Sequence, residues 1–545
     1  MSIISDHTRK NITGDSFLKG TFILAVAGIV VKVIGSLNWI FVSRVLGGEG
    51  IGLYQMAFPI YLLALSISSA GIPVAISIIT AEKLAVKDIF GAKRVFRISL
   101  TLLAITGLLF SLLTYFGAGL LVEYKFIRDP RAYYSVAALA PAIFFVTILS
   151  SYRGYLQGWQ RMTPTAVSQI AEQIFRVVTM VVFATLLMPK GLEFAAGGAS
   201  LGAFAGSVAG LAVLLYYYWR LEKEIKQQAG MGAGPATEEA AGRIIKRIFK
   251  LALPVSASSI MLPLVANLDL LVVPARLEVA GYSVEQATEL FGYLTGMAVP
   301  LINLATILTA SLATSLVPAI ADAQARGDRL TVFQRTASAM RIANLITFPA
   351  FMLIFLLDAP ISLMIYNAPN AGPAVGVMAT AIVLLGIHQV TTGVLQGLGH
   401  TTIPVVNMGL AAVVKVLLNW VLTAMPELGI KGAAWATVAD IGVAAVMNMY
   451  FVNKYVGYHI DLRDIAKTLT ATAVMGAAVY AVYDETLLIL GSNTLATLGA
   501  ILAGGVVYVI VIVLAGGVNE RDVSRIPLAG KVLIKMLRVA GRLKS

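Results

Sequence analysis

The sequence predicts an all-α polytopic membrane protein of about fourteen transmembrane helices. We expect two parallel six-helix repeats forming two lobes around a central cavity, followed by two extra C-terminal helices. Of the 545 residues, 58% are hydrophobic and only 13% are charged, whereas soluble chains carry roughly 25% charged residues. Apolar runs of about 20 residues, long enough to cross a bilayer, recur along the whole chain. The motif Gly154–Gly158 returns 239 residues later as Gly393–Gly397.

The expected spans follow one another with short polar connections. Their centres lie near Val30, Ala64, Leu108, Ala142, Val177 and Ala205 in the first repeat, near Pro263, Leu308, Phe351, Leu384, Val414 and Ala444 in the second, and near Met475 and Val506 in the final pair. We interpret the first run as an uncleaved span rather than a signal peptide, because it continues past Lys32 to Val42.

These spans predict five regions along the chain. They are an N-terminal lobe (1–220), a cytoplasmic linker (221–250), a C-terminal lobe (251–456), two extra spans (457–518) and a basic amphipathic cytoplasmic tail (519–545). Because each repeat holds an even number of spans, both copies enter the membrane from the same side. Such an internal repeat is typical of transporters that rock two lobes around a central site.

The distribution of basic residues predicts the orientation. With both termini in the cytoplasm, only seven of the 41 lysines and arginines fall in outer loops, as the positive-inside rule requires. The net charge of +13 therefore needs no nucleic-acid partner to explain it.

The sequence contains no pattern typical of an enzyme. There is no cysteine, the four histidines are scattered without metal-ligand spacing, and no glycine-rich nucleotide loop is present. The outer acids Glu49, Glu123, Asp129 and Glu193 are expected at four separate places rather than in one catalytic site. We therefore expect no catalytic residue, no metal and no cofactor.

Charges inside the expected spans mark the candidate site, because a charge at mid-bilayer costs about 2.5–3.5 kcal/mol on insertion scales. Lys32 lies deep in the first span, with no acid within a turn of it, and Arg44 follows toward the outer surface. Glu172 and Arg176 are four residues apart on one helical face. They form either an internal salt bridge or part of a cationic cavity for an anionic group such as phosphate. Arg44 is alternatively a snorkelling residue at the outer headgroups.

Polar residues in the second half suggest structural pairs. Lys415 and Asp440 lie about half-way across adjacent spans, and Asp269 and Arg276 lie two turns apart near an outer end. We expect ion pairs for both, with a coupling role as the alternative. Asn267, beside the second pair, is a candidate for the cavity wall.

Several strings identify a resemblance over essentially the whole chain. They are Tyr152–Gly158, Met162–Gln169, Glu172–Arg176, Ser43–Gly47 and Gly50–Tyr54. The sequence resembles the polysaccharide-exporter branch of the multidrug/oligosaccharidyl-lipid/polysaccharide flippase superfamily. Within that branch it is most similar to the stage V sporulation protein B group, relatives of lipid II flippases.

The resemblance implies a flippase of the bacterial cytoplasmic membrane. Its substrate would be a lipid-linked sugar, such as an undecaprenyl-diphosphate-linked peptidoglycan precursor, translocated by alternating access. Lipid II flippases have an arginine-lined cavity in the N-terminal lobe; Lys32 occupies what looks like one such position, and Asn38 stands where another arginine is expected. The implied partners are this precursor, membrane lipids and a coupling ion, and the protein is expected to be a monomer. The alternatives are a cation-coupled multidrug exporter of the same fold, and a non-transporting scaffold for wall or spore-coat assembly, in which Lys32 would be buried and inert.

Overall fold

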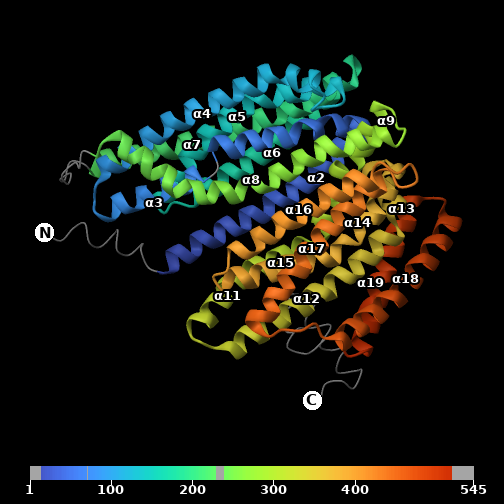
Figure 1. Cartoon of the computed structure of the whole chain (residues 1–545). Helices are drawn as coiled ribbons and strands as arrows, with labels where there is room; N and C mark the ends of the chain where they lie inside the picture. The colour runs from blue at the N-terminus through green and yellow to red at the C-terminus, as the bar shows by residue number, and fades with distance from the viewer. Residues whose placement is uncertain (1–13, 70, 229–238, 518–545) are drawn as a thin grey trace. The chain divides into compact units, whose positions relative to one another are not determined.

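The computed structural model describes residues 14–69, 71–228 and 239–517, and every regular element in these ranges is helical, which confirms the all-α fold class (Figure 1). Contacts divide the chain into two compact units, one made of residues 1–274 and 284–292 and the other of residues 275–283 and 293–545.

The helices of the first half are α2 (Gly14–Ser69), α3 (Ile72–Ala85), α4 (Ile89–Glu123), α5 (Tyr133–Gly158), α6 (Thr163–Leu187), α7 (Leu192–Gln228), α8 (Ala241–Val279) and α9 (Val284–Gly292). Those of the second half are α10 (Val299–Ala305), α11 (Ile307–Ala325), α12 (Arg329–Leu356), α13 (Asp358–Tyr366), α14 (Gly372–Ala379), α15 (Ala381–Gly397), α16 (Thr402–Leu422), α17 (Ile430–Val456), α18 (Leu462–Leu490) and α19 (Asn493–Leu514). Short turns of 3-10 or π type are η1 (Pro130–Ala132), η2 (Met188–Lys190), η4 (Tyr293–Ala298) and η5 (Pro369–Ala371).

Within the described ranges, 12 segments are long and apolar enough to cross a membrane, or 13 if the bent pair Pro369–Ala379 and Ala381–Gly397 forms one span. The first segment, Val26–Ala85, has 60 residues, about three times the length that one crossing needs. The chain turns back inside it at Gly47, whose φ of 65° and ψ of −173° suit only glycine. The protein is therefore a multi-pass membrane protein, and the count of fourteen spans stays a prediction.

The turn at Gly47 divides α2 into two arms that pack on each other. Trp39 and Tyr54 are 15 residues apart, which in a straight helix would separate them by about 22 Å. Their rings instead lie 5.8 Å apart, edge to face. This contact brings the two expected spans centred on Val30 and Ala64 side by side.

The repeated motif makes the same close helix contact in each unit. A Cβ atom built on Gly154 of α5 would lie 2.5 Å from the carbonyl oxygen of Pro73 on α3. One built on Gly393 of α15 would lie 2.6 Å from the carbonyl oxygen of Ala313 on α11. Both distances are too short for a side chain, so both positions need glycine. Pro73 and Ala313 are themselves 240 residues apart.

A second contact occurs in both units with its partners exchanged. In the first, Gly107 of α4 faces Thr147 of α5, and a Cβ on the glycine would lie 2.9 Å from the threonine Cβ. In the second, Thr347 of α12 faces Gly386 of α15, with a closest distance of 2.7 Å. The pair is thus kept as one small and one larger residue, which preserves the helix spacing.

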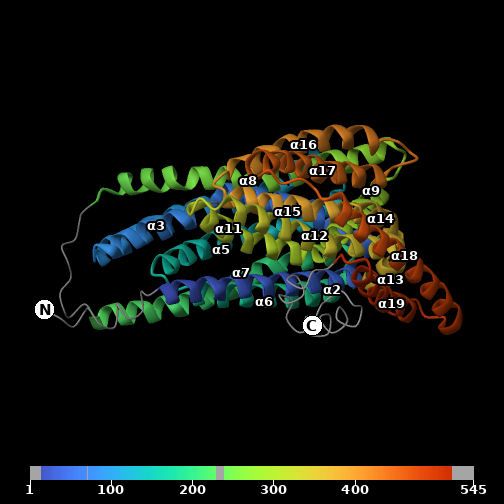
Figure 2. The same cartoon turned by 90° about the horizontal axis from the view of Figure 1, so that it is seen from below.

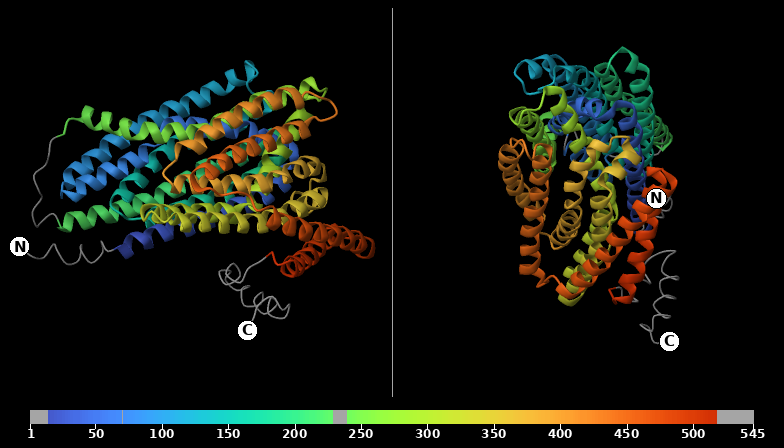
Figure 3. Two further views of the ribbon diagram at one scale, coloured as in Figure 1. Left: turned by 60° about the horizontal axis from the view of Figure 1, so that its bottom comes forward. Right: turned by 90° about the vertical axis from the view of Figure 1, so that its right-hand side faces the viewer.

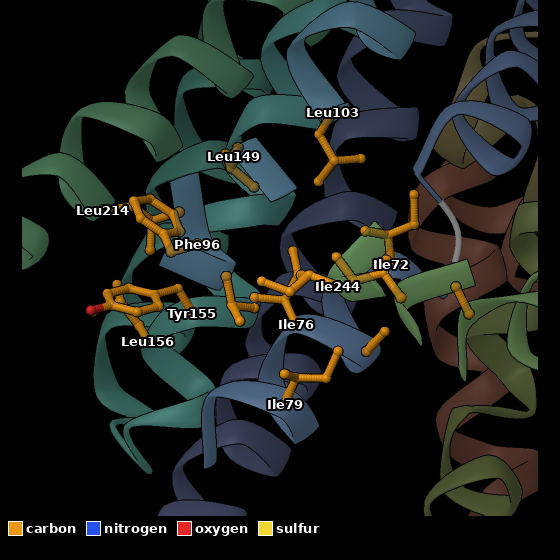
Figure 4. Packing of buried hydrophobic residues seen from close by; sticks show 14 of the residues in the cluster. Ile72, Ile76, Ile79, Phe96, Leu103, Leu149, Tyr155, Leu156, Leu214 and Ile244 are labelled. Atoms are coloured by element: carbon orange, nitrogen blue, oxygen red, sulfur yellow. The ribbon is translucent and has the colours of Figure 1, made fainter. Parts of the chain in front are cut away.

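The core of the first unit is built where α3, α4, α5, α7 and α8 meet (Figure 4). Within it, Phe96 stacks on Tyr155 at 4.4 Å and is tilted against Tyr218 at 5.2 Å. In the second unit, Phe333 packs on Tyr458 at 6.1 Å. Tyr218 and Tyr458 are 240 residues apart, so the aromatic contact also occurs in both halves.

The structure describes the two ends of the predicted linker but not the predicted basic tail. The residues expected as a linker are helical at both ends, since α7 continues to Gln228 and α8 begins at Ala241. Residues 229–238 and the expected basic tail at 519–545 lie outside the described residues. The extra helices α18 and α19 pack side by side, as the red pair in Figures 1 and 3 shows, and α16 lies along α17 (Figure 2).

Candidate functional site

Two arginines share one glutamate in the interior of the first unit. Arg153 of α5 donates from a terminal nitrogen to Glu172 of α6 at 2.9 Å, and Arg176 donates to the other carboxylate oxygen at 2.7 Å. Their side chains are only 14–22% exposed. Two guanidinium groups and one carboxylate leave a net charge of +1, which is costly at membrane depth unless an anion compensates it.

Close helix packing positions this cluster. Gly198, Gly202, Gly206 and Gly210 of α7 all face α6, and a Cβ on Gly206 would lie 2.5 Å from the carbonyl oxygen of Glu172. The glycine face lets the two backbones approach closely, as small residues do in membrane helices. Ser168, one turn before Glu172, accepts a hydrogen bond from Nε of Arg153 at 3.1 Å and fixes the plane of that guanidinium.

Two buried tyrosines lie near Arg176. Tyr54 and Tyr61, both on the second arm of α2 and both buried, lie close enough to Arg176 for electrostatic interaction. Among the described residues, Nε of Arg176 has no hydrogen-bond partner. This buried nitrogen is therefore a donor that the described residues leave unsatisfied.

The first arm of α2 runs beside this part of α6. A Cβ on Gly35 would lie 3.2 Å from the Gln173 side chain, and the amide nitrogen of Asn38 lies 3.2 Å from the sulfur of Met180. Lys32, one turn before Gly35, is exposed and forms no ion pair with any described carboxylate. The role of Lys32 in binding an anionic substrate stays a prediction.

Three other candidates occupy different surroundings. Asn38 is buried, with 5% of its surface exposed. Asn267 of α8 is equally buried and donates to the carbonyl oxygens of Pro59 and Pro263, at 2.8 and 2.7 Å, so its amide nitrogen links helices near two prolines. Arg44 is exposed on α2, and its proposed contact with substrate stays a prediction.

The predicted ion pairs of the second half also stay predictions. Lys415 is buried on α16 and Asp440 is half-buried on α17, and these two helices pack together. Arg276 donates from Nε to the carbonyl oxygen of Trp420 at 2.8 Å and lies 4.4 Å from the centre of that indole ring. Asp269 is half-buried on α8.

In the second unit, a neutral residue stands at the position equivalent to Arg153. Thr392, which is 239 residues after Arg153, accepts a hydrogen bond from Asn448 at 3.0 Å. Asn407 donates to Asn448 at 2.8 Å, and the ring nitrogen Nδ1 of His388 lies 3.3 Å from the Asn448 amide nitrogen. The position equivalent to Arg176 keeps a cation, because Lys415 lies 239 residues after it and is buried.

One expectation about the outer acids is wrong. Glu49 and Asp129 do not lie at separate places, because Arg131 binds both, at 2.7 and 2.8 Å. Thr288 also donates to Asp129 at 2.9 Å. Asp129 is only 1% exposed, so this group is an internal ion network. Among the described residues no three His, Cys, Asp or Glu side chains form a metal site.

Sequence reasoning did not include Arg153, Tyr54 or Tyr61 in the site. Arg153 carried a usable signal, since it is an arginine within an apolar span and sits one residue before the repeated motif. The tyrosines carried none, because only the fold-back of α2 at Gly47 brings them to Arg176.

Comparison with known proteins agrees with this architecture. The family model described as "Polysaccharide biosynthesis protein" matches residues 17–284. Stage V sporulation protein B of Bacillus subtilis (strain 168) is 31% identical over 520 residues, covering 95% of this chain and 99% of the relative. Lipid II flippase MurJ of the same organism is 25% identical over 481 residues, covering 85% and 87%.

A solved structure shows the same fold. The inward closed conformation of lipid II flippase MurJ aligns with a TM-score of 0.68 at 15% identity, covering 92% of this chain and 100% of that one. The chain belongs to the stage V sporulation protein B family, within the superfamily of polysaccharide and lipid flippases.

Proposed function

We propose that this protein is a flippase that moves a lipid-linked sugar, carried on undecaprenyl diphosphate, across the bacterial cytoplasmic membrane. A peptidoglycan precursor such as lipid II is the substrate that the relative named lipid II flippase MurJ suggests. The relative with a named activity, lipid II flippase MurJ, is a flippase, and the chain is a membrane transporter and not an enzyme. The positive-inside rule supports cytoplasmic termini.

The observation that carries the proposal is the excess positive charge of the Arg153–Glu172–Arg176 cluster. A diphosphate would supply the missing negative charge, and a guanidinium binds phosphate oxygens through charge-assisted hydrogen bonds. Lys32, on the helix arm that runs beside α6, adds a further cation. In this proposal the polyprenyl tail stays in lipid while the lobes alternate access to the two sides.

A multidrug exporter is disfavoured by the same geometry. Such a transporter needs an intramembrane carboxylate for its coupling cation or cationic drug. Both oxygens of Glu172 are already bound, one to Arg153 and the other to Arg176. A scaffold role predicts a buried Lys32, whereas Lys32 is exposed.

Transport by reconstituted protein tests the proposal. Liposomes containing the protein and a fluorescent undecaprenyl-diphosphate sugar are treated with a membrane-impermeant quencher, and the rate of transfer between leaflets is measured. Loss of one charge-assisted hydrogen bond of about 1.5–3 kcal/mol predicts a transfer rate lower by about tenfold or more in Arg176→Gln and in Arg153→Gln. Arg176→Lys should keep part of the rate because it keeps the charge.

Arg161→Gln is the matched control, since Arg161 also pairs with a glutamate, Glu224, but lies between spans. Its transfer rate should equal that of the wild type. Equal rates in the wild type and in an Arg153→Gln, Arg176→Gln double variant would refute the cationic site. A Lys32→Ala, Arg44→Ala double variant tests the contribution of α2 in the same assay.

Accessibility gives an independent readout, because the chain has no cysteine. Single cysteines replacing Lys32 and Arg176 are probed with a water-soluble thiol reagent added on each side of the membrane. We expect labelling from at least one side at both positions. Protection of both positions from both sides would show that no aqueous cavity reaches the cluster.

A further inference from the structure

The second unit contains an open cavity of about 560 Å³ next to the second copy of the repeated motif. Its polar lining comes from Gln324, Arg329, His400, Lys454 and Tyr455. The His400 ring stacks on the Tyr455 ring at 4.1 Å, and Nζ of Lys454 lies 5.9 Å from the centre of the same ring. One tyrosine thus connects two basic side chains along one wall.

Two cations of this cavity stand outside any ion pair among the described residues. Neither Arg329 nor Lys454 forms an ion pair with a described carboxylate. The acids nearest in sequence are otherwise bound, because Asp328 accepts from the backbone and side chain of Thr331, and Asp322 pairs with Arg326. Arg329 and Lys454 are therefore free to pair with an anion that enters the cavity.

The equivalent place in the first unit is neutralised. Arg161, which is 239 residues before His400, pairs with Glu224, and Lys93 pairs with Glu222 at 2.6 Å. Both glutamates lie on the end of α7, beyond Tyr218.

Helix α17 lacks this extension. It ends at Val456, and Gly457 adopts a left-handed conformation with φ 74°. Tyr458, which packs on Phe333 as Tyr218 packs on Phe96, already lies beyond the helix. The carboxylate 240 residues after Glu224, Asp464, lies instead on the first turn of α18 and pairs with Arg341 at 2.7 Å, so it forms no ion pair with the cations of the cavity.

The position of the cavity indicates its depth in the membrane. Three candidate spans end at its wall: Ile307–Ala325 ends beside Gln324, Arg329–Leu356 begins with Arg329, and Ile430–Val456 ends beside Tyr455. Span ends lie at the level of lipid headgroups. Next to the cations, Leu330 and Tyr455 are 67% and 43% exposed, which suits contact with acyl chains and the interface.

We propose that this cavity binds a phosphoryl group at headgroup depth, carried by an anionic phospholipid. Arg329 and Lys454 would contact the phosphate oxygens, and basic pockets between membrane helices on the cytoplasmic side bind anionic headgroups in this way. The site is separate from the Arg153–Glu172–Arg176 cluster and does not depend on which substrate is transported.

Lipid binding to the full-length protein tests this proposal. The purified protein in detergent is titrated with phosphatidylglycerol or with zwitterionic phosphatidylcholine, and bound lipids are counted by native mass spectrometry. Each cation near a membrane surface contributes about 1 kcal/mol to anionic lipid binding. The Arg329→Gln, Lys454→Gln double variant should therefore bind phosphatidylglycerol about thirtyfold more weakly, and the wild type should prefer it over phosphatidylcholine.

The matched control is Lys223→Gln, Lys226→Gln, which removes two exposed cations from α7. It should bind phosphatidylglycerol as the wild type does, and Lys454→Arg should as well. Unchanged affinity in the Arg329→Gln, Lys454→Gln variant would overturn the site. If an equal concentration of inorganic phosphate displaced phosphatidylglycerol, the bound phosphoryl group would not need to come from a lipid, and that part of the proposal would be overturned.

Discussion

Replacing Gly206 by alanine should push α7 away from the helix that carries Glu172 and Arg176. The added Cβ would lie 2.5 Å from the carbonyl oxygen of Glu172 and 3.0 Å from Cβ of Arg176, whereas ordinary contact begins near 3.4 Å. The two backbones must therefore separate locally by about 0.9 Å. Because the obstacle is backbone rather than a flexible side chain, rotation of a side chain cannot relieve it.

The size of the effect follows from two opposing contributions. Overpacking of this kind costs about 1–3 kcal/mol. Alanine is favoured over glycine inside a helix by about 0.5–1 kcal/mol. The free energy of unfolding of Gly206→Ala should thus fall by about 0–2.5 kcal/mol relative to the wild type, and by about 1–3 kcal/mol relative to a glycine-to-alanine change without the clash.

Gly117→Ala on α4 is the matched control, because nothing lies within 4 Å of its added Cβ. It should gain only the helical preference of alanine. Unfolding is followed by circular dichroism in mixed micelles titrated with sodium dodecyl sulfate. If Gly206→Ala unfolds at the same denaturant fraction as Gly117→Ala, the close approach of α6 and α7 does not exist in the protein.

Three further outcomes can be measured. Glu172→Gln leaves Arg153 and Arg176 without their shared counter-charge, so unfolding in the same micelles should become easier by about 2 kcal/mol; an unchanged midpoint would contradict the ion cluster. Gly386→Thr should clash with Thr347, and adding Thr347→Gly, which restores the Gly107–Thr147 arrangement, should recover most of the loss. Hydrogen bonds from Thr331 lower the pKa of Asp328 below its ordinary value of 3.8. Asp328 is the N-cap of α12, and its stabilising contribution is present above that ordinary value and is lost as pH falls through the lowered pKa. Amide hydrogen exchange at the start of α12 should therefore accelerate below about pH 4. In Asp328→Asn, the exchange rate should show no such acceleration from the titration of this group.

Much of the fold could be predicted from the sequence because hydropathy and repetition are local properties. Twenty-residue apolar runs dictate membrane helices, and the four-residue spacing of Glu172 and Arg176 places them on one face. The second arginine of the cluster was not predictable in the same way. Arg153 reaches Glu172 across a turn and from another helix, and only the packing of the helices determines that contact.

Long-range contacts also explain the wrong expectation about the outer acids. Glu49 follows the turn at Gly47, and Asp129 precedes η1, so their separation of 80 residues suggests independence. Arg131 joins them because its guanidinium has several donors and reaches both carboxylates. Neither spacing nor composition contains that information.

The exchanged glycine and threonine bear on how this protein can be recombined. A chimera that takes α15 into the first lobe would set Gly386 opposite Gly107 and leave a void, whereas one that takes α5 into the second would oppose Thr147 and Thr347. The glycine and the threonine pack on each other only when both helices come from the same half of the chain. Grafts between the two halves should therefore be cut at lobe boundaries and not at single helices.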